Sequence, residues 1–501
     1  MQTTKKLVYS NAFYSIIQVI ISGVLLFILY KFLLKTLGSE LFGLWALILG
    51  LTSFSQFADF GFSASLTKFV AKYDSLKDEA KISRLIQTAI VSTAVSSFVV
   101  LLALYPLIKF LLLRTVNSGL ADITLKIIPL SLISFWFILI SNTIESSLDG
   151  LQLIRLKNLI IMFYSFLNCT ILLTAAIKFG ILGLAYSQII SSIIILILNW
   201  TFLRKNLKKI PFFPLVWEKK SFKEIINYSI TFQASSIIKI FFEPTVKIFL
   251  ARYNGLSFVS YFELGSKLII KLRQLIISAN YVLVPAYASL KEKSPEKISN
   301  IFKKSYYLIF FTSVLLFSGV ILFSPLISKV WFGDFNKTFV LYLVFLSVAW
   351  FVSTINAPAY FLNLGTGELV WNLFSDIAVM IINISMIFII GKNISSYGVI
   401  ISWSLALFIG SFLVSISPIS KKYLRFSEFI EKKSLVLLVF SICYITIFLI
   451  LYFLPFFNNL DAKYRLIIIY TFPAIYLFAF LIIIKVLKVD LSEFLYFFKK
   501  K

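Results

Sequence analysis

Seven charged side chains lie in the interior of two neighbouring apolar segments, six of them at a spacing of four residues. They are Lys239, Glu243 and Lys247 in segment 224–251, and Glu263, Lys267, Lys271 and Arg273 in segment 256–285. Residues four apart lie on one face of a helix. Because an ionised side chain near the bilayer centre costs about 2.5–3.5 kcal/mol on insertion scales, such a face predicts a partner or a water-filled cavity.

Two interpretations of these stripes are open. In antiparallel helices with a rise of about 1.5 Å per residue, Glu263 comes level with Lys247, and Glu243 with Lys267 by the same geometry, so ion pairs would join the two helices. The two stripes hold five cations against two acids, so pairing would still leave three cations without an acid. That excess predicts a cationic cavity for an anionic substrate, bound by Lys239, Lys247, Lys267, Lys271 and Arg273. Glu243 and Glu263 are predicted to tune this charge or to couple transport, and Pro244 predicts a bend.

Further acids lie in other apolar segments. Asp59 and Asp376 are each open to two roles, a protonatable group that couples transport or a structural contact. Glu145 and Asp149 lie toward the end of another segment, four residues apart.

The composition places these residues in an integral membrane protein. The chain has 501 residues, of which 59% are hydrophobic and only 14% charged, whereas soluble proteins carry about 25% charged residues. Histidine is absent, and the two cysteines lie in apolar runs, so we expect no catalytic residues, no cofactor and no metal site. The net charge of +26 comes from short clusters between apolar segments, which argues against nucleic acid as a partner.

Fourteen runs are long and apolar enough to span a membrane as helices, each about 20 residues or more. Their ranges are 10–35, 42–66, 86–112, 127–149, 158–178, 181–203, 224–251, 256–285, 305–328, 338–362, 369–391, 396–418, 435–455 and 463–488. With this division, 31 Lys and Arg residues lie on the side of the N-terminus and 11 on the other side. By the positive-inside rule we expect both termini in the cytoplasm.

An internal repeat relates the two halves of the chain. A shift of about 215 residues aligns segments 127–203 with 338–418. The paired residues include Gly150 and Gly365, Asn168 and Asn383, Gly183 and Gly398, and Ser187 and Ser402, with a weaker match between Gly38 and Gly255. An even number of helices separates the copies, so we expect two six-helix lobes related by a pseudo-two-fold axis along the membrane normal.

The repeat predicts four parts. They are an N-lobe at 1–203, a basic cytoplasmic linker at 204–223, a C-lobe at 224–418, and two extra helices with a basic tail at 419–501. The fold class is therefore an all-α polytopic membrane protein.

Several short runs resemble Wzx-type polysaccharide (O-antigen) flippases of the multidrug/oligosaccharidyl-lipid/polysaccharide (MOP) exporter superfamily. In the first half these are 38–43, 57–61 and 69–72, and in the second half 251–255, 261–267 and 284–288. The resemblance covers most of the chain and implies a MATE-like fold.

The resemblance implies movement of an undecaprenyl-diphosphate-linked oligosaccharide from the cytoplasmic to the outer leaflet of a bacterial inner membrane, by alternating access. It also implies coupling to a proton or sodium gradient, and a polysaccharide polymerase with its chain-length machinery as partners. Our reading of the residues agrees on one point, because a diphosphate carries the negative charge that surplus Lys and Arg residues would receive.

Other functions stay open to different degrees. A flippase for the peptidoglycan lipid precursor would share the fold and the cationic cavity. A multidrug exporter of organic cations would need an acidic cavity instead. An enzyme would need larger outward loops than the dozen or so residues found here, and a purely structural partner would not explain the charges inside the membrane.

Overall fold

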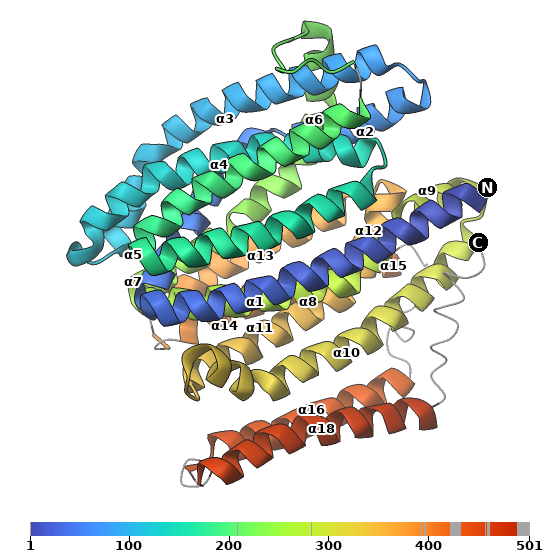
Figure 1. The fold of residues 1–501 in the computed structure, drawn as a ribbon. Coiled ribbons are helices and arrows are strands. Elements are labelled where there is room, and N and C mark those ends of the chain that lie inside the picture. Colours follow the sequence, from blue (N-terminus) through green and yellow to red (C-terminus); the bar gives the residue numbers. More distant parts are fainter. Residues whose placement is uncertain are drawn as a thin grey trace. The chain divides into compact units, whose positions relative to one another are not determined.

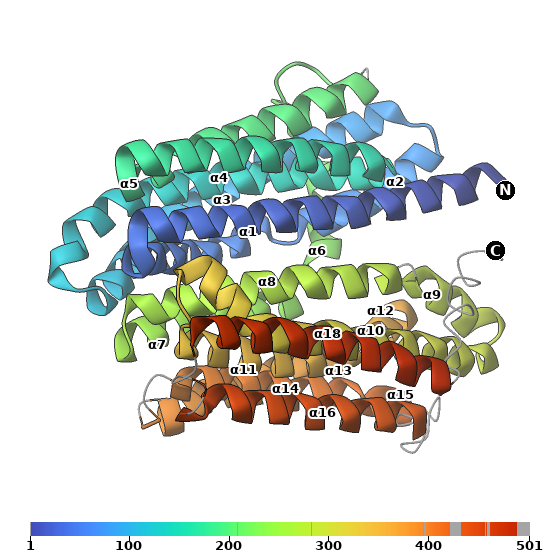
Figure 2. The same ribbon diagram turned by 60° about the horizontal axis from the view of Figure 1, so that its bottom comes forward.

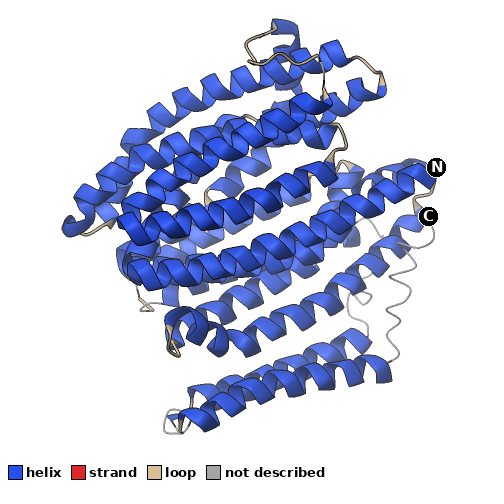
Figure 3. Cartoon of the chain, viewed as in Figure 1, coloured by secondary structure: helices blue, strands red, loops and turns tan. Residues whose placement is uncertain are grey.

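The computed structural model describes nearly all of the chain. The described residues are 2–207, 209–281, 283–391, 393–394, 397–420, 432–455, 457 and 461–487. They form helices joined by short loops, with no strand among them (Figure 3). The predicted all-α fold is confirmed. The predicted tail at 488–501 and the basic segment 421–431 lie outside the described residues.

Residue contacts divide the chain into two compact units, Met1–Glu263 and Leu264–Lys501. The helices of the first unit are α1 (Gln2–Thr52), η1 (Ser53–Asp59), α2 (Phe62–Ser75), α3 (Glu79–Thr115), η2 (Ser118–Leu120), α4 (Ala121–Gly150), α5 (Ile154–Asn206), α6 (Lys219–Ile240), α7 (Phe242–Tyr253) and the first turns of α8 (Leu256–Tyr281).

The second unit holds the rest of α8 and all later helices (Figure 1). These are α9 (Leu283–Lys293), α10 (Glu296–Phe332), α11 (Lys337–Ile355), α12 (Ala357–Thr366), α13 (Val370–Met386), η3 (Ile387–Gly391), α14 (Gly398–Val414), α15 (Ile416–Ser420), α16 (Lys432–Phe453) and α18 (Ala462–Val486). The predicted lobe boundaries at 204–223 and 418 stay predictions.

Two long elements of the first unit each contain a break at a glycine. Gly38 in α1 has φ 75° and ψ 170°, and Gly180 in α5 has φ 60° and ψ −143°. Side chains with a Cβ rarely adopt these angles. Each break therefore separates two helices, at the places where the sequence predicts one membrane span to end and the next to begin.

The described residues contain fourteen membrane-length helical passes. Ten helical stretches are long and apolar enough to cross a bilayer, and the two broken ones hold two passes each. The remaining two passes are the charged ones, formed by α6 with α7 and by α8. The predicted count is confirmed, and the chain is a multi-pass membrane protein.

Each unit has its own apolar core. In the first unit, α2 to α6 enclose a cluster of fully buried side chains that includes Val70, Leu85, Leu148 and Leu203, and α4 packs against α5 and α3 (Figure 2). In the second unit α10 packs against α11, α16 and α18, and α16 and α18 lie side by side (Figures 1 and 2).

The two copies of the predicted repeat share a close helix approach. A Cβ added to Gly183 would overlap the carbonyl oxygen of Ala175, and one added to Gly398 would overlap that of Ile390. Both oxygens lie eight residues before their glycine. The same local packing at positions 215 apart supports the repeat.

A second glycine pair behaves in the same way. A Cβ on Gly150 would lie 2.9 Å from the carbonyl oxygen of Thr67, and one on Gly365 would lie 2.6 Å from that of Val284. Each glycine thus lets the end of one helix pack against the backbone of another.

The segment between α5 and α6 is bonded to α3. Four hydrogen bonds join it to side chains of α3, from Ser83 to the Lys209 carbonyl, and to Gln87, Ser92 and Thr88 from the Val216 amide, the Trp217 indole and the Glu218 amide. This segment therefore follows α3 along part of its length.

Candidate functional site

A buried ion cluster centres on Lys247 of α7. Its ammonium lies 2.7 Å from a Glu243 carboxylate oxygen and 2.6 Å from one of Glu263 on α8. Lys247 is 1% exposed and Glu263 2%. The predicted approach of Glu263 to Lys247 is confirmed, and the spacing of the two stripes was the signal for it.

Groups from α1 complete this cluster. The Tyr30 hydroxyl donates to Glu263 at 3.3 Å, and the Lys247 ammonium donates to the Ala46 carbonyl at 3.2 Å. A Cβ on Gly50 would lie 2.7 Å from Lys247 Cδ, so the missing side chain makes room for the lysine. Lys247 is thus enclosed in the fold, and a role in direct substrate contact stays a prediction.

Arg273 of α8, in the second unit, has different surroundings. Its guanidinium lies over the Trp350 ring of α11, 5.0 Å from the ring centroid, and Trp350 packs against Trp403 of α14 at 5.8 Å. Among the described residues no carboxylate pairs with Arg273, and its buried Nε has no hydrogen-bond partner. This cation is held by an aromatic face and carries no counter-charge from the described part of the chain.

The other predicted charges of the second unit are placed less distinctively. Lys267 and Lys271 are partly buried on α8, and Asp376 of α13 is 7% exposed. All three take part in interactions within the structure. Their predicted roles in binding and coupling stay predictions.

A polar cavity of about 590 Å³ lies in the first unit, where α2, α4 and α6 meet. We call it the acidic cavity, because three carboxylates and one lysine line it. Its lining residues are Gln56, Asp59, Gly61, Ser63, Ala64, Leu139, Asn142, Glu145, Ser146, Asp149, Lys239 and Ile240. Lys239, predicted to belong to a cationic cavity, thus lies in a cavity richer in acids.

A break in the second predicted span forms one wall of the acidic cavity. The helix turns from η1 to α2 through Phe60 (φ 43°) and Gly61 (φ 76°), both in the left-handed region. Asp59 lies at this break and accepts a hydrogen bond from the Ser63 hydroxyl at 2.7 Å. Its carboxylate therefore bonds to a side chain in the first turn of α2 and also lines the cavity.

A second break faces the first. Helix α6 ends at Ile240, and α7 begins at Phe242. Between them Phe241 packs against Phe54 and Phe57, with ring centroids 5.3 Å apart in each case. The helix is thus interrupted three residues before Pro244, the residue from which a bend is predicted, and Lys239 lies two residues before the interruption.

The opposite wall carries two acids of α4. The ammonium of Lys157 lies 2.7 Å from a carboxylate oxygen of Asp149 and 3.8 Å from one of Glu145. Lys157 is not among the residues that line the cavity, although it is ion-paired with both carboxylates.

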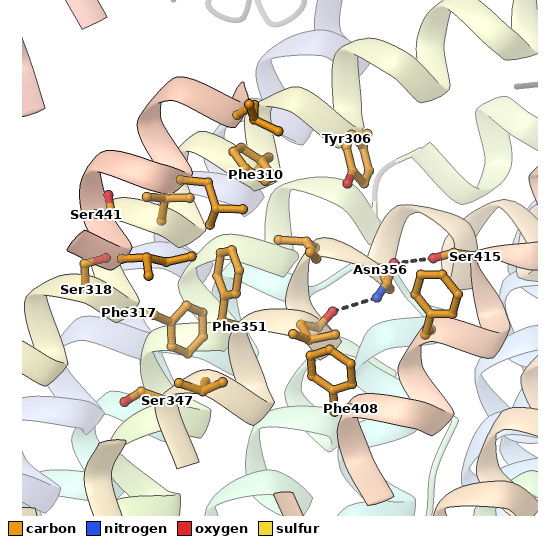
Figure 4. A pocket seen from close by; sticks show the side chains of 18 of the residues that line it. Tyr306, Phe310, Phe317, Ser318, Ser347, Phe351, Asn356, Phe408, Ser415 and Ser441 are labelled. Carbon is orange, nitrogen blue, oxygen red and sulfur yellow. Dashed lines mark hydrogen bonds between the residues drawn. The ribbon is translucent and has the colours of Figure 1, made fainter. Parts of the chain in front are cut away.

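An apolar cavity of about 560 Å³ lies in the second unit, between α10, α11, α14 and α16. Aromatic side chains converge on it, with Phe310 and Phe317 from α10, Phe351 from α11 and Phe408 from α14 (Figure 4). Polar groups such as Asn356 lie at its margin, where the amide is bonded within the protein. Such a lining suits a hydrocarbon chain.

Comparison with protein families decides the family. The family model described as polysaccharide biosynthesis protein matches residues 8–291, more than half of the chain. The chain belongs to this family. No curated protein matches the sequence significantly.

Solved structures of transporters share the fold of the chain. The lipid II flippase MurJ in an inward closed conformation is 15% identical with a TM-score of 0.67, over 96% of this chain and 99% of that one. An inward-facing MATE multidrug transporter of the MOP superfamily is 14% identical with a TM-score of 0.63, over 80% and 94%. A point mutant of the Vibrio cholerae MATE transporter VcmN is 13% identical with a TM-score of 0.60, over 84% and 98%. The expected MOP-type fold is confirmed.

The sequence did not point to several residues of these sites. Tyr30 and Trp350 had no signal, because single aromatic residues do not stand out among 54 Phe, 24 Tyr and 8 Trp. Asn142 would have been found by extending the face of Glu145 and Asp149 back along the helix.

Proposed function

We propose that the chain is a Wzx-type flippase that carries an undecaprenyl-diphosphate-linked oligosaccharide from the cytoplasmic to the outer leaflet of the bacterial inner membrane. The carried glycan would serve O-antigen, capsule or exopolysaccharide synthesis, and the mechanism would be alternating access. Family membership supports a role in polysaccharide export. The single observation that supports a diphosphate substrate is the placement of Arg273. It is a membrane-embedded cation with no carboxylate partner among the described residues.

The geometry of Arg273 suits a diphosphate. Stacking on Trp350 holds the guanidinium plane and leaves its N–H edge to donate, and that edge binds phosphate oxygens in pairs. An unpaired charge in an apolar slab costs several kcal/mol, which a bound anion offsets. A neutral lipid would leave this cost in place.

The apolar cavity supports a lipid as the carrier of that diphosphate. Its aromatic and aliphatic lining offers dispersion contacts to a flexible isoprenoid chain. We propose that Lys267 and Lys271, on the same helix as Arg273, add positive charge at the headgroup.

We also propose that transport is coupled to an ion gradient. The acids that would carry a proton or bind sodium are Asp376, Asp59, Glu243 and Glu263. Lys247 then acts as a positioning residue, because its two ion pairs hold Glu243 and Glu263.

The proposal is tested by flipping in vesicles. Purified protein is reconstituted with a fluorescent undecaprenyl-diphosphate-N-acetylglucosamine, and the fraction that dithionite cannot quench is followed over time. We expect Arg273→Ala to reduce the rate at least about tenfold and Arg273→Lys to recover part of it, because lysine keeps the charge without the paired donors. Arg114→Ala is the matched control, since Arg114 also stacks on an aromatic ring, Phe110, at an exposed position.

Two outcomes would replace this proposal. Faster flipping of the pentapeptide-bearing peptidoglycan precursor than of the simple glycan lipid would favour the peptidoglycan function. The acidic cavity favours a second candidate, an organic-cation antiporter, because three carboxylates line it. Proton-driven ethidium efflux without lipid flipping would assign that function instead.

A further inference from the structure

We propose that the acidic cavity of the first unit is the glycan subsite, and that it accepts neutral or amine-bearing sugars and rejects sugars that carry a carboxylate. This inference rests on the proposed flippase function and adds the class of sugar. It concerns the first unit only, whereas the diphosphate proposal concerns Arg273 of the second.

The size of the cavity fits a ligand. At about 590 Å³ it falls in the range of about 300–1,000 Å³ typical of small-molecule pockets.

The backbone around the cavity also favours a binding site. Two helices are interrupted there, one at Phe60 and Gly61 and the other at Phe241. Irregular backbone at membrane depth is tolerated where it is packed in protein or lines a polar cavity, and broken helices in transporters commonly hold the substrate site. Packing of Phe241 on Phe54 and Phe57 fixes the two breaks against each other.

The polar lining matches sugar hydroxyls. Carboxylates accept hydrogen bonds, and amides and hydroxyls both donate and accept them. The lining groups are the carboxylates of Asp59, Glu145 and Asp149, the amides of Gln56 and Asn142, and the hydroxyls of Ser63 and Ser146. The two hydroxyls already donate within the protein, to Asp59 and to the Asn142 carbonyl, so they serve a ligand as acceptors. A site built to bond hydroxyl groups discriminates strongly against ligands that leave those groups unpaired.

The charge of the lining sets the class of sugar. Three carboxylates face one ammonium, that of Lys239. Lys157 pairs with Asp149 and Glu145 but is not among the residues that line the cavity. Concave surfaces concentrate the field of one sign, so the cavity attracts an amine and repels a carboxylate on the ligand.

The first test measures the field without changing any of the acids. Ser146→Cys is introduced into a cysteine-free chain with the substitutions Cys169→Ser and Cys443→Ser. The rate at which the new thiol is modified is measured with a cationic and with an anionic methanethiosulfonate. Ser118→Cys in the exposed turn η2 corrects for the intrinsic reactivity of the two reagents. We expect the corrected ratio to favour the cationic reagent about tenfold. A ratio near one would overturn the proposal.

The second test measures selection among sugars. Undecaprenyl-diphosphate probes carrying N-acetylglucosamine, glucosamine or glucuronic acid are compared in the vesicle assay. We expect the wild-type protein to flip the first two probes and to flip the glucuronic acid probe at least about tenfold more slowly. The double variant Glu145→Gln plus Asp149→Asn should reduce this difference in rate. Asn142→Ala, which leaves the charges in place, should slow the neutral probe and keep the preference.

The results separate this inference from the proposed function. Equal flipping of all three probes by the wild-type protein would overturn the sugar subsite and leave the flippase intact. Flipping of none of them would remove the flippase itself. Unchanged preference in the double variant, at normal yield of folded protein, would also overturn the subsite.

Discussion

Lys247 and Arg273 are both cations of the charged helices, yet the structure treats them in opposite ways. Lys247 is enclosed by Glu243, Glu263 and a backbone carbonyl, with room made for it by a glycine. Arg273 rests on an indole ring and has no carboxylate partner among the described residues. The first arrangement uses charge to join helices, and the second leaves charge available to a ligand.

A charge inside a membrane is therefore evidence of a binding site only once its partners are known. Replacing Lys247 should therefore damage the fold, whereas replacing Arg273 should damage transport.

The largest effect is expected for Lys247→Met. Removing one partner of a buried ion pair leaves uncompensated charge and costs about 3–5 kcal/mol. Thermal unfolding in detergent, followed by the loss of monodisperse protein, measures the change. Adding Glu263→Leu to the same chain should restore part of the loss, and a single variant as stable as the wild type would contradict the cluster's structural role.

A smaller effect is expected for Gly50→Ala. The added methyl would approach Lys247 Cδ at 2.7 Å, and overpacking of this kind costs about 1–3 kcal/mol. Gly319→Ala is the control, because a Cβ there meets nothing within 4 Å. If both variants unfold at the same temperature, the lysine has more freedom than the structure indicates.

Arg273→Met should change stability less again. The variant loses a cation–π contact worth about 0.5–2 kcal/mol but also removes an unpaired charge from the membrane, so the two changes oppose each other. We expect an unfolding temperature close to that of the wild type together with the loss of lipid flipping. A large fall in unfolding temperature would make Arg273 a structural residue, like Lys247.

The smallest effect is expected outside the membrane, at Glu218. The Ser221 hydroxyl and then the Lys81 ammonium donate to its carboxylate and lower its pKa. A lowered pKa in the folded state means that this stabilisation is present above the usual pKa of 4.5 and is lost as the pH falls below it. Because solvent screens the pair, Glu218→Gln should cost less than about 1 kcal/mol at pH 7, and this cost should shrink as the pH falls below 4.5. A loss that persists at pH 3 would point to packing instead.

Part of the fold and of the candidate sites could be predicted from the sequence, for physical reasons. Hydropathy and helical spacing are local properties, so the fourteen membrane passes could be predicted from the sequence. Counting residues along two antiparallel helices also predicts that Glu263 lies at the same depth as Lys247. The contact of Arg273 with Trp350 joins distant segments, and no spacing rule predicts which aromatic ring a cation will meet. Predicting the acidic cavity would have required both helix breaks as well as the acids. Of the two breaks, only the one near Pro244 had a signal in the sequence.

The segment between α5 and α6 also limits what the chain tolerates. Its amides, indole and carbonyl are hydrogen-bonded to side chains of α3 from Ser83 to Ser92. It therefore acts as a spacer of fixed length and not as a flexible linker. Reporter tags placed between 209 and 218 for topology mapping would pull this spacer from its supports, and a tag at a free turn such as η2 is the safer choice.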